Sequence, residues 1–499
     1  MIGTRRRLIL ASVVFALVLI SFQLRTRADD PLPATPTTAV PPTESPPPAE
    51  TPTVTEATEA SARPPIVLGV HIPPRVMDYE NDISYFEQQA GRELGYLWYY
   101  QAWDNGFDPY LPQRLERLST PPVIMITWEP FLSPNKARPA ENLQNIVDGV
   151  YDDYIRQFAR GIKSRPKEIY LIRFGHEMNL AETPWGGAQS YNGNDPSRYV
   201  KAYRRIRQIF REEGVTNTQF VWSPNVKSWP PDPWNHWSNY YPGDDVVDWI
   251  GVSAFNWGTG SIHGGWTSFN DLLGSFLTEV SCRYAKPVML AEIGSVNERK
   301  PEWLNGMFQT LSSNYPNVRA LSFYNVYATD YPGKPDFRVI MNRSRPLPLD
   351  AAVTDAYRRG IADPTRFIST MPSLSQLQVQ RQCPTVQLQK DSVMLDMFTT
   401  AFPVSLDPAA GAGSTVQLGL EGFPPGTSAW FAPTVTLDGN NRTTWLHLNQ
   451  RGAAPGHYTA YVTAGGVSRV PLRLYVPQRA YRQFMPLLVR NQQRTRAYP

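Results

Sequence analysis

From residue 66 onward, short apolar runs alternate with longer amphipathic stretches. Eight of the runs have the length and content of buried parallel strands, which are apolar on both faces. The predicted strands are residues 66–72, 94–101, 123–128, 169–174, 219–223, 249–254, 288–291 and 320–324. Helical patterns such as 140–162 and 197–213 lie between them, the second with Asp195 and Ser197 near its start. This alternation predicts an α/β fold, a (β/α)8 barrel.

After about residue 386 the pattern changes to short alternating strands separated by Gly/Pro turns. The predicted strands are residues 416–420, 434–437, 444–448, 457–462 and 470–476. They predict a small all-β, immunoglobulin-like sandwich. Its aromatic residues are Trp430, Trp445, Tyr458 and Tyr461, and their spacing does not separate a binding surface from a core. We therefore expect a structural accessory domain.

The first residues have the pattern of an export signal. Arg5, Arg6 and Arg7 precede an apolar run at residues 8–24, and no clear small-x-small cleavage site follows. We favour an uncleaved N-terminal membrane anchor over a cleaved signal peptide, and either one puts the body at the cell surface or outside the cell. Residues 29–64 are rich in Pro and Thr and predict an extended spacer.

These patterns divide the chain into six parts. They are a signal or anchor at 1–28, a disordered linker at 29–64, the barrel at 65–365, a linker at 366–385, the sandwich at 386–477 and a basic tail at 478–499.

Composition narrows the classes of function. The chain has 14 Trp and 25 Tyr, and sugar-binding clefts use such flat aromatic surfaces. The net charge of +4 is spread along the chain, which argues against a nucleic-acid partner. The six histidines show neither HxxxH nor HExxH spacing, and there is no glycine-rich phosphate loop, so no metal and no cofactor are expected. Cys282 and Cys383 are either one disulfide or two separate buried thiols.

Two strands deliver a glutamate at their carboxyl ends. The strand at 169–174 leads into Arg173, His176, Glu177 and Asn179, and the strand at 288–291 leads directly into Glu292. Carboxyl ends of barrel strands converge on one mouth. Hydrolysis of a glycosidic bond needs two carboxyl groups, so this pair predicts a glycosidase site.

Several motifs then show a resemblance in the right order along residues 66–345. They are Arg173-x-x-His176-Glu177-Met178-Asn179, Pro184-Trp185-Gly186-Gly187, Val221 to Asn225, Tyr241 to Gly251, and Pro287 to Gly294. Together they resemble glycoside hydrolase family 26. That family contains β-mannanases, and some members act on mixed-linkage β-glucan or β-1,3-xylan.

The resemblance implies a retaining endo-glycosidase with Glu177 as general acid/base and Glu292 as nucleophile, about 5 to 5.5 Å apart. It also implies that His176 hydrogen-bonds the sugar at the cleavage subsite, that Asn179 shapes the loop, and that Trp185 and Trp257 stack on sugars. The candidate substrate-binding residues are His176, Arg173, Asn179, Trp185, Trp128, Glu129, Trp222, Asn225, Phe255, Trp257 and Tyr324.

Three of these candidates have an open structural alternative. His176 could be a histidine satisfied within the barrel layer, and Trp185 could be loop packing. Trp222 could point into the strand layers and support Asn225.

Two positions depart from the family pattern. Many members carry a tyrosine after the sixth strand that orients the nucleophile, whereas this chain has Phe255. Unless another residue supplies the missing hydroxyl, activity or substrate range is expected to differ. The third strand ends in Trp128-Glu129-Pro130 in place of the histidine of well-known mannanases, and Glu129 could pair with Arg173 or bind a sugar hydroxyl. Both departures argue against mannan as the particular substrate more than they argue against hydrolytic activity.

The sequence therefore predicts an exported, monomeric endo-β-glycosidase whose partner is a polysaccharide of the β-mannan or β-glucan type. The alternative is an inactive barrel that binds carbohydrate or assists assembly of an envelope polysaccharide. Retention of both glutamates favours the first reading.

Overall fold

The computed structural model describes residues 63–73, 78–131, 139–261, 263–328, 335–383, 385–395, 399–407, 415–465 and 468–477. The predicted signal or anchor, nearly all of the spacer and the basic tail lie outside these ranges. Within the ranges, no helix is long and apolar enough to cross a membrane. The membrane anchor stays a prediction, because residues 8–24 are not described.

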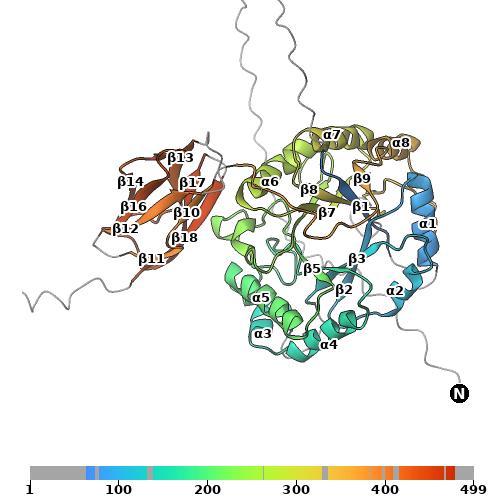
Figure 1. The fold of residues 1–499 in the computed structure, drawn as a ribbon, viewed down its shortest axis with the longest axis horizontal. Coiled ribbons are helices and arrows are strands. Elements are labelled where there is room, and N and C mark those ends of the chain that lie inside the picture. Colours follow the sequence, from blue (N-terminus) through green and yellow to red (C-terminus); the bar gives the residue numbers. More distant parts are fainter. Residues whose placement is uncertain are drawn as a thin grey trace, which may run out of the picture. The chain divides into compact units, whose positions relative to one another are not determined.

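Eight parallel strands form a closed barrel (Figure 1). Each strand pairs with its neighbour in chain order, and β1 also pairs with β8, which closes the sheet. The strands are β1 (Ile66–His71), β2 (Tyr96–Ala102), β3 (Val123–Glu129), β4 (Tyr170–Phe174), β5 (Thr218–Trp222), β6 (Trp249–Asn256), β7 (Val288–Ser295) and β8 (Val318–Tyr324). All eight predicted strands are confirmed, and β7 continues past its predicted end to Ser295.

Helices surround the barrel (Figure 1). They are α1 (Tyr79–Ala90), α2 (Tyr110–Leu115), α3 (Leu143–Val147), α4 (Asp152–Lys163), α5 (Pro196–Glu212), α6 (Phe269–Arg283), α7 (Lys300–Ser313) and α8 (Ala351–Gly360). Asp195 caps α5 as predicted, since its carboxylate accepts the Ser197 N–H. The helical pattern over 140–162 is divided into α3 and α4. Gly149 lies between them with φ +83°, a conformation that favours glycine and turns the chain.

Side chains alternate along each strand between the barrel interior and the helix layer. On β4, Leu171 faces the interior, whereas Tyr170, Ile172 and Phe174 pack under the helices. The interior cluster of the barrel consists of Val67, Tyr96, Trp98, Met125, Leu171, Val221, Trp249, Met289, Ala291 and Ala320. It is a packed core, and the next inward positions toward the carboxyl ends carry the polar groups described below.

The segment after α8, residues 367–383, runs along the amino-terminal end of the barrel; we call it the strap. Its first residues form β9 (Phe367–Ile368), which pairs with the beginning of β1. Leu377 is 3% exposed and belongs to the interior cluster, and Met371 packs against the same cluster. The strap therefore closes the apolar floor of the barrel.

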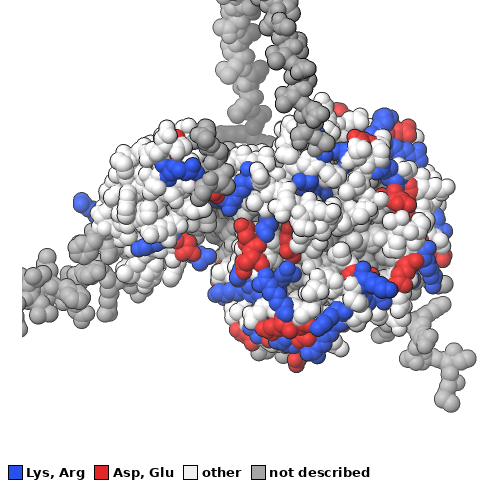
Figure 2. Space-filling model, viewed as in Figure 1, with Lys and Arg blue, Asp and Glu red and all other residues white. Residues whose placement is uncertain are grey.

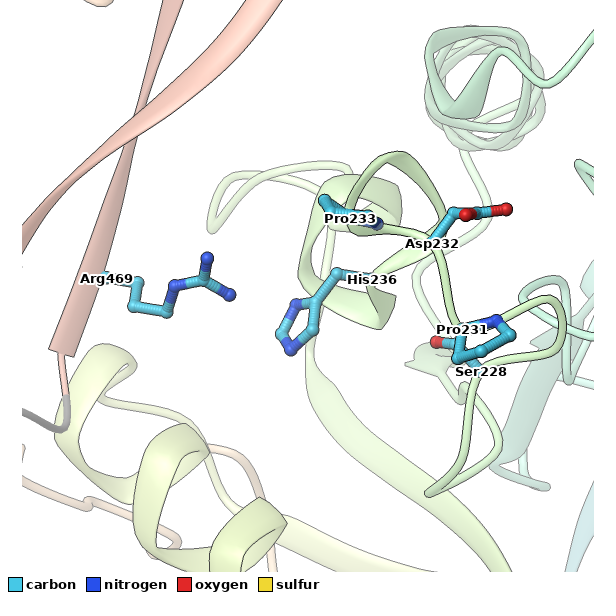
Figure 3. A pocket seen from close by; sticks show the side chains of 6 residues that line it. All are labelled: Ser228, Pro231, Asp232, Pro233, His236 and Arg469. Atoms are coloured by element: carbon cyan, nitrogen blue, oxygen red, sulfur yellow. The ribbon is translucent and has the colours of Figure 1, made fainter. Parts of the chain in front are cut away.

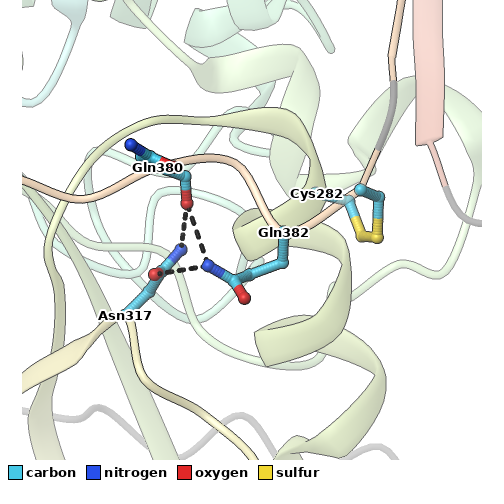
Figure 4. Close-up of a disulfide and its surroundings, with 5 residues drawn as sticks. Cys282, Asn317, Gln380 and Gln382 are labelled. Atoms are coloured by element: carbon cyan, nitrogen blue, oxygen red, sulfur yellow. Dashed lines mark hydrogen bonds between the residues drawn. A yellow bond between two sulfur atoms is a disulfide. The ribbon is translucent and has the colours of Figure 1, made fainter. Parts of the chain in front are cut away.

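A disulfide holds the end of the strap. Cys383 is bonded to Cys282 on α6, so the disulfide is the alternative that the structure contains (Figure 4). Next to it, the Gln382 side-chain amide donates to the Asn317 side-chain oxygen and to the Gln380 carbonyl. The crosslink ties the chain after the barrel back onto a barrel helix.

The C-terminal residues form two sheets packed face to face (Figure 1). One sheet has the order β10-β12-β16-β14 and the other β11-β18-β17-β13-β15. The strands are β10 (Val386–Leu388), β11 (Ser392–Met394), β12 (Thr400–Leu406), β13 (Val416–Glu421), β14 (Thr427–Ala432), β15 (Thr436–Leu437), β16 (Thr443–Gln450), β17 (Gly456–Ala464) and β18 (Ser468–Val476). The five predicted strands are confirmed. Four strands were not predicted. Strands β10 and β11 have only three residues each. In β12 and β14, Pro403 and Trp430 occupy outward positions where a polar residue would signal alternation.

Charges of both signs are interspersed over the surface around α4 and α5 (Figure 2). Arg156 pairs with Glu212 and Glu213, and Arg205 pairs with Asp152 across the two helices. Such exposed pairs contribute roughly 0–1 kcal/mol each, so packing rather than ion pairing holds these helices.

Candidate active site

Glu292 reaches the barrel interior because β7 is irregular at this point. Met289 and Ala291 face inward, and Leu290 and Ile293 face the helices, so strict alternation would turn Glu292 outward. The pairings of β7 with both β6 and β8 shift register here. A bulge of this kind re-aims one side chain. Glu292 accordingly lies inside, 4% exposed, with hydrogen bonds from across the barrel.

Both carboxylate oxygens of Glu292 accept a hydrogen bond from a fixed donor. Arg173 Nη1 donates to Oε2 at 2.7 Å, and the Tyr100 hydroxyl donates to Oε1 at 2.5 Å. Arg173 is itself fully buried and also donates to the Ser253 and Thr127 hydroxyls. The guanidinium balances the charge of the carboxylate, and the two donors fix its orientation. Burial raises the pKa of Tyr100 well above its usual value, and the negative charge of Glu292 raises it further. The Tyr100 hydroxyl therefore keeps its proton and remains a donor.

Glu177 lies just past β4 in an unusual backbone conformation. Its φ is +53°, in the left-handed region that side chains other than glycine rarely adopt, and its N–H donates to the Ser223 carbonyl at 2.9 Å. Asn225 Nδ2 donates to Glu177 Oε1 at 3.0 Å. The Lys227 N–H donates to Asn225 Oδ1, which fixes the orientation of that amide.

The two glutamates are in opposite environments. Burial raises the pKa of Glu177 to about 7, and the charge of Glu292 adds to the rise. Glu177 therefore holds a proton near neutral pH. Glu292 faces a cation and a hydroxyl donor instead. One carboxyl group can donate a proton while the other acts as a carboxylate.

Asn179 holds the β5 loop and has no exposed surface. Its Nδ2 donates to the Asn225 carbonyl and to Ser228 Oγ, and its Oδ1 accepts the Asn225 N–H. These bonds place Asn225 against Glu177. Asn179 thus contacts Glu177 only through Asn225, and its role in shaping the active-site loop stays a prediction.

His176 and Trp185 form one packed unit. Trp185 is 3% exposed, and its Nε1 donates to the His176 carbonyl at 2.6 Å, so the structure has the loop-packing alternative for this tryptophan. The His176 ring lies 5.7 Å from the Tyr100 ring. Burial, with the nearby Arg173 charge, lowers the pKa of His176 well below its usual value. The imidazole is therefore neutral beside the carboxylates.

Glu129 is a third carboxyl group at the mouth. It occupies the inward position after Thr127 on β3 and is partly exposed. Burial first, and then the charge of Glu292, raise the pKa of Glu129 to about 8. Among the described residues Glu129 forms no ion pair with Arg173, which is taken by Glu292. A protonated Glu129 can donate a hydrogen bond to a sugar hydroxyl.

Aromatic rings line the β6 and β8 side. Phe255 lies 5.7 Å from both Trp257 and Tyr324, and Tyr324 stacks on His71 at 5.3 Å. These three predicted residues are partly exposed and are brought together as a wall of the mouth.

Trp128 and Trp222 are not brought to the mouth. Neither side chain has exposed surface. The Trp128 ring stacks on the Phe158 ring of α4, with the ring centroids 4.3 Å apart, and Trp222 packs against Trp237. They occupy outward positions of β3 and β5, which point into the helix layer. The prediction that they bind substrate is wrong for this geometric reason.

Tyr100, Ser253 and Thr127 were missed by the sequence reasoning. No motif marks them, because each is an isolated residue within an apolar strand. The available signal for Tyr100 was alternation, since it is the next inward position after Trp98 on β2.

A shallow pocket lies apart from the carboxylates (Figure 3). Its lining side chains are Ser228, Pro231, Asp232, Pro233, His236 and Arg469. Neither Glu177 nor Glu292 is among them. In the described part of the chain, no three His, Cys, Asp or Glu side chains gather as metal ligands would.

Residues 145–317 match the family model described as glycosyl hydrolase family 26. The match lies within the barrel, which is therefore similar in sequence to that family. The chain is 29% identical over 302 residues to endoglucanase H of Acetivibrio thermocellus, a match that covers 59% of this chain and 31% of that protein. It is 32% identical over 114 residues to β-1,3-xylanase TXYA of a Vibrio species, covering 23% of this chain and 22% of that protein.

The chain therefore spans less than a third of the length of either relative. Among solved structures, an endo-β-1,4-mannanase double mutant of Cellulomonas fimi is 16% identical with a TM-score of 0.46, covering 83% of this chain and 94% of that one.

Proposed function

We propose that this chain is an exported retaining endo-β-glycosidase that hydrolyses a β-linked polysaccharide of the mannan or glucan type. The observation that carries the proposal is the contrast between two glutamates in one barrel. Glu177 is half-buried, and desolvation raises its pKa to about 7, whereas Glu292 accepts hydrogen bonds from Arg173 and Tyr100. Retaining hydrolysis needs this division between a proton donor and a nucleophile.

In the first step Glu177 protonates the glycosidic oxygen while Glu292 attacks the anomeric carbon. The bond from the anomeric carbon to the leaving oxygen breaks, and an ester bond to Glu292 forms. Because Asn225 donates to Glu177 Oε1, that oxygen is an acceptor and the transferable proton resides on Oε2. In the second step Glu177 takes a proton from water, which attacks the anomeric carbon and releases Glu292.

Arg173 and Tyr100 act as positioning residues in this scheme. They hold the Glu292 carboxylate in one orientation, so little rearrangement is needed before attack. Tyr100 supplies a hydroxyl that Phe255 lacks, and it does so from β2 instead of from β6, beside the nucleophile.

The substrate class rests on the match to the family model and on the names of the relatives. These names point to glucan and to β-1,3-xylan. The sequence motifs around Glu177 and Glu292 add the β-mannanases of the family that this chain resembles. Glu129 and the aromatic wall of Phe255, Trp257 and Tyr324 are the groups expected to select among these glycans.

Export is supported by two independent features. The apolar run at 8–24 follows three arginines, and the Cys282–Cys383 disulfide is typical of proteins that fold in an oxidising compartment. The anchor and cell-surface location are part of this proposal.

The testing experiment measures product release from mannan, glucomannan, mixed-linkage glucan, carboxymethyl cellulose, β-1,3-xylan and β-1,3-glucan. Wild type is compared with Glu177→Ala and Glu292→Ala. Hydrolysis of at least one glycan, abolished by both substitutions and giving products that keep the β-configuration, is expected. If no glycan is cut although one is bound, the inactive-barrel alternative replaces this proposal.

A further inference from the structure

One face of the sandwich carries two exposed tryptophans on neighbouring strands. Trp430 on β14 is 41% exposed and Trp445 on β16 is 48% exposed. In the strand register Trp430 lies opposite His447, and Trp445 is two residues before His447 on the same face. The Trp430 and His447 rings are stacked, with centroids 5.2 Å apart and planes within 10°. We call these three residues the aromatic strip.

The strip lies on an uncharged sheet face. Strands β12, β14 and β16 contain no Asp, Glu, Lys or Arg, although 18% of the whole chain is charged. Pro403 lies opposite Trp445, and Ser428 and Asn449 form the next pair beyond Trp430. The other sheet, by contrast, carries Arg469 paired with Glu421. The strip is therefore a flat apolar surface with neutral hydroxyl and amide groups beside it.

Burial settles a question that spacing left open. Tyr461 is 2% exposed and Tyr458 is half-buried against the sandwich core, so these two belong to packing. The two tryptophans are not in the core cluster. Single exposed aromatics are ordinary on a surface, but two neighbouring indoles on one flat sheet face indicate a binding site.

We infer that the aromatic strip binds a neutral polysaccharide chain by stacking sugar rings on Trp430 and Trp445. A pyranose ring has a flat face of C–H groups, which an indole covers, while its hydroxyls point sideways to water and to neutral donors and acceptors. A polyanion finds no cation on these strands, so charge complementarity favours an uncharged glycan. The site stands independently of hydrolysis in the barrel.

The test uses the full chain with Glu177→Gln, so that a bound glycan is not cut during the measurement. Binding to insoluble mannan, cellulose and β-1,3-xylan is measured by depletion from solution for this parent and for Trp430→Ala/Trp445→Ala on the same background. The control is Tyr475→Ala, an equally exposed aromatic (41%) on the other sheet. The barrel cleft is the same in all three proteins.

The double tryptophan variant is expected to bind at least one of these glycans about tenfold or more weakly than the parent, with the control within twofold. Thermal unfolding midpoints report folding; if the double variant is unfolded, each single variant is expected to lose about threefold or more. Equal binding by parent and tryptophan variants overturns the inference, as does a parent that dimerises through this face. If wild type hydrolyses no glycan but binding still depends on Trp430 and Trp445, the result counts against the proposed function and not against this inference.

Discussion

The two ends of the barrel are built on opposite principles. At the mouth, Arg173 and Glu292 are buried as an ion pair, and Glu177 holds a left-handed backbone. At the floor, the strap adds Leu377 to an apolar cluster, and the Cys282–Cys383 disulfide ties it to α6. Buried charge and positive φ lower the free energy of unfolding, whereas apolar packing and a crosslink raise it.

The contrast predicts which property of the protein a substitution at each end of the barrel affects. Changes at the mouth are expected to alter catalysis whether or not they alter folding, and changes at the floor to alter folding alone, as in barrels whose function is confined to the carboxyl ends of the strands.

Glu177→Gly should separate catalysis from stability most clearly. Loss of the general acid lowers the hydrolysis rate by on the order of 10²–10⁴-fold. The free energy of unfolding should not fall, because glycine accepts φ +53° and a partly desolvated carboxyl group is removed. Kinetics and urea unfolding measure the two effects. Asn194→Gly, which has φ +55° away from the carboxylates, is the matched control and should keep both values. A marked loss of stability in Glu177→Gly would contradict the contrast.

Arg173→Met tests the buried ion pair. It leaves Glu292 without its cation and should lower the free energy of unfolding by about 3–5 kcal/mol. Arg205→Met breaks the exposed pair with Asp152 and should cost roughly 0–1 kcal/mol. Urea unfolding of both variants measures the two losses. Equal losses in the free energy of unfolding would show that the effect of Arg173→Met does not come from the burial of its ion pair.

Cys282→Ser/Cys383→Ser tests the floor. Removing a crosslink that spans 101 residues should lower the free energy of unfolding by about 2–4 kcal/mol. Hydrolysis at 25 °C should stay within about twofold of wild type, since the strap contacts the opposite end of the barrel. Wild type unfolded with and without reductant is the control. A large fall in kcat would show that floor and mouth are coupled.

Tyr100→Phe should lower kcat by about 10–100-fold with little change in KM, because it removes one hydrogen bond to a charged nucleophile. Tyr99→Phe removes a hydroxyl from the same strand, but that hydroxyl faces Gln101 in the outer layer, so its kinetics should match wild type. If Tyr100→Phe has wild-type kcat, the hydroxyl of Tyr100 does not replace the one that Phe255 lacks.

The pH profile gives the smallest effect. Since the pKa of Glu177 is raised to about 7, the acid is protonated below that pH, and kcat/KM should fall about tenfold per pH unit above it. The hydrogen bond from Asn225 lowers this pKa, so Asn225→Ala should move the alkaline limb to higher pH. A shift toward lower pH would contradict the assigned role of Asn225.

The sequence alone determined the barrel, because apolar runs and helix caps are local signals that each segment carries by itself. It also determined where Glu177 and Glu292 stand along the chain, since both follow strands that converge in this fold. The cap at Asp195 and five sandwich strands are of the same kind.

Only the tertiary structure decided which way particular side chains face. The bulge that turns Glu292 inward, the reach of Tyr100 from β2, and the outward direction of Trp128 and Trp222 all depend on register between strands. Trp430 and Trp445 on the sandwich surface are a further instance. Register and burial arise from partners distant in the chain, and a one-residue shift reverses the face that a side chain presents.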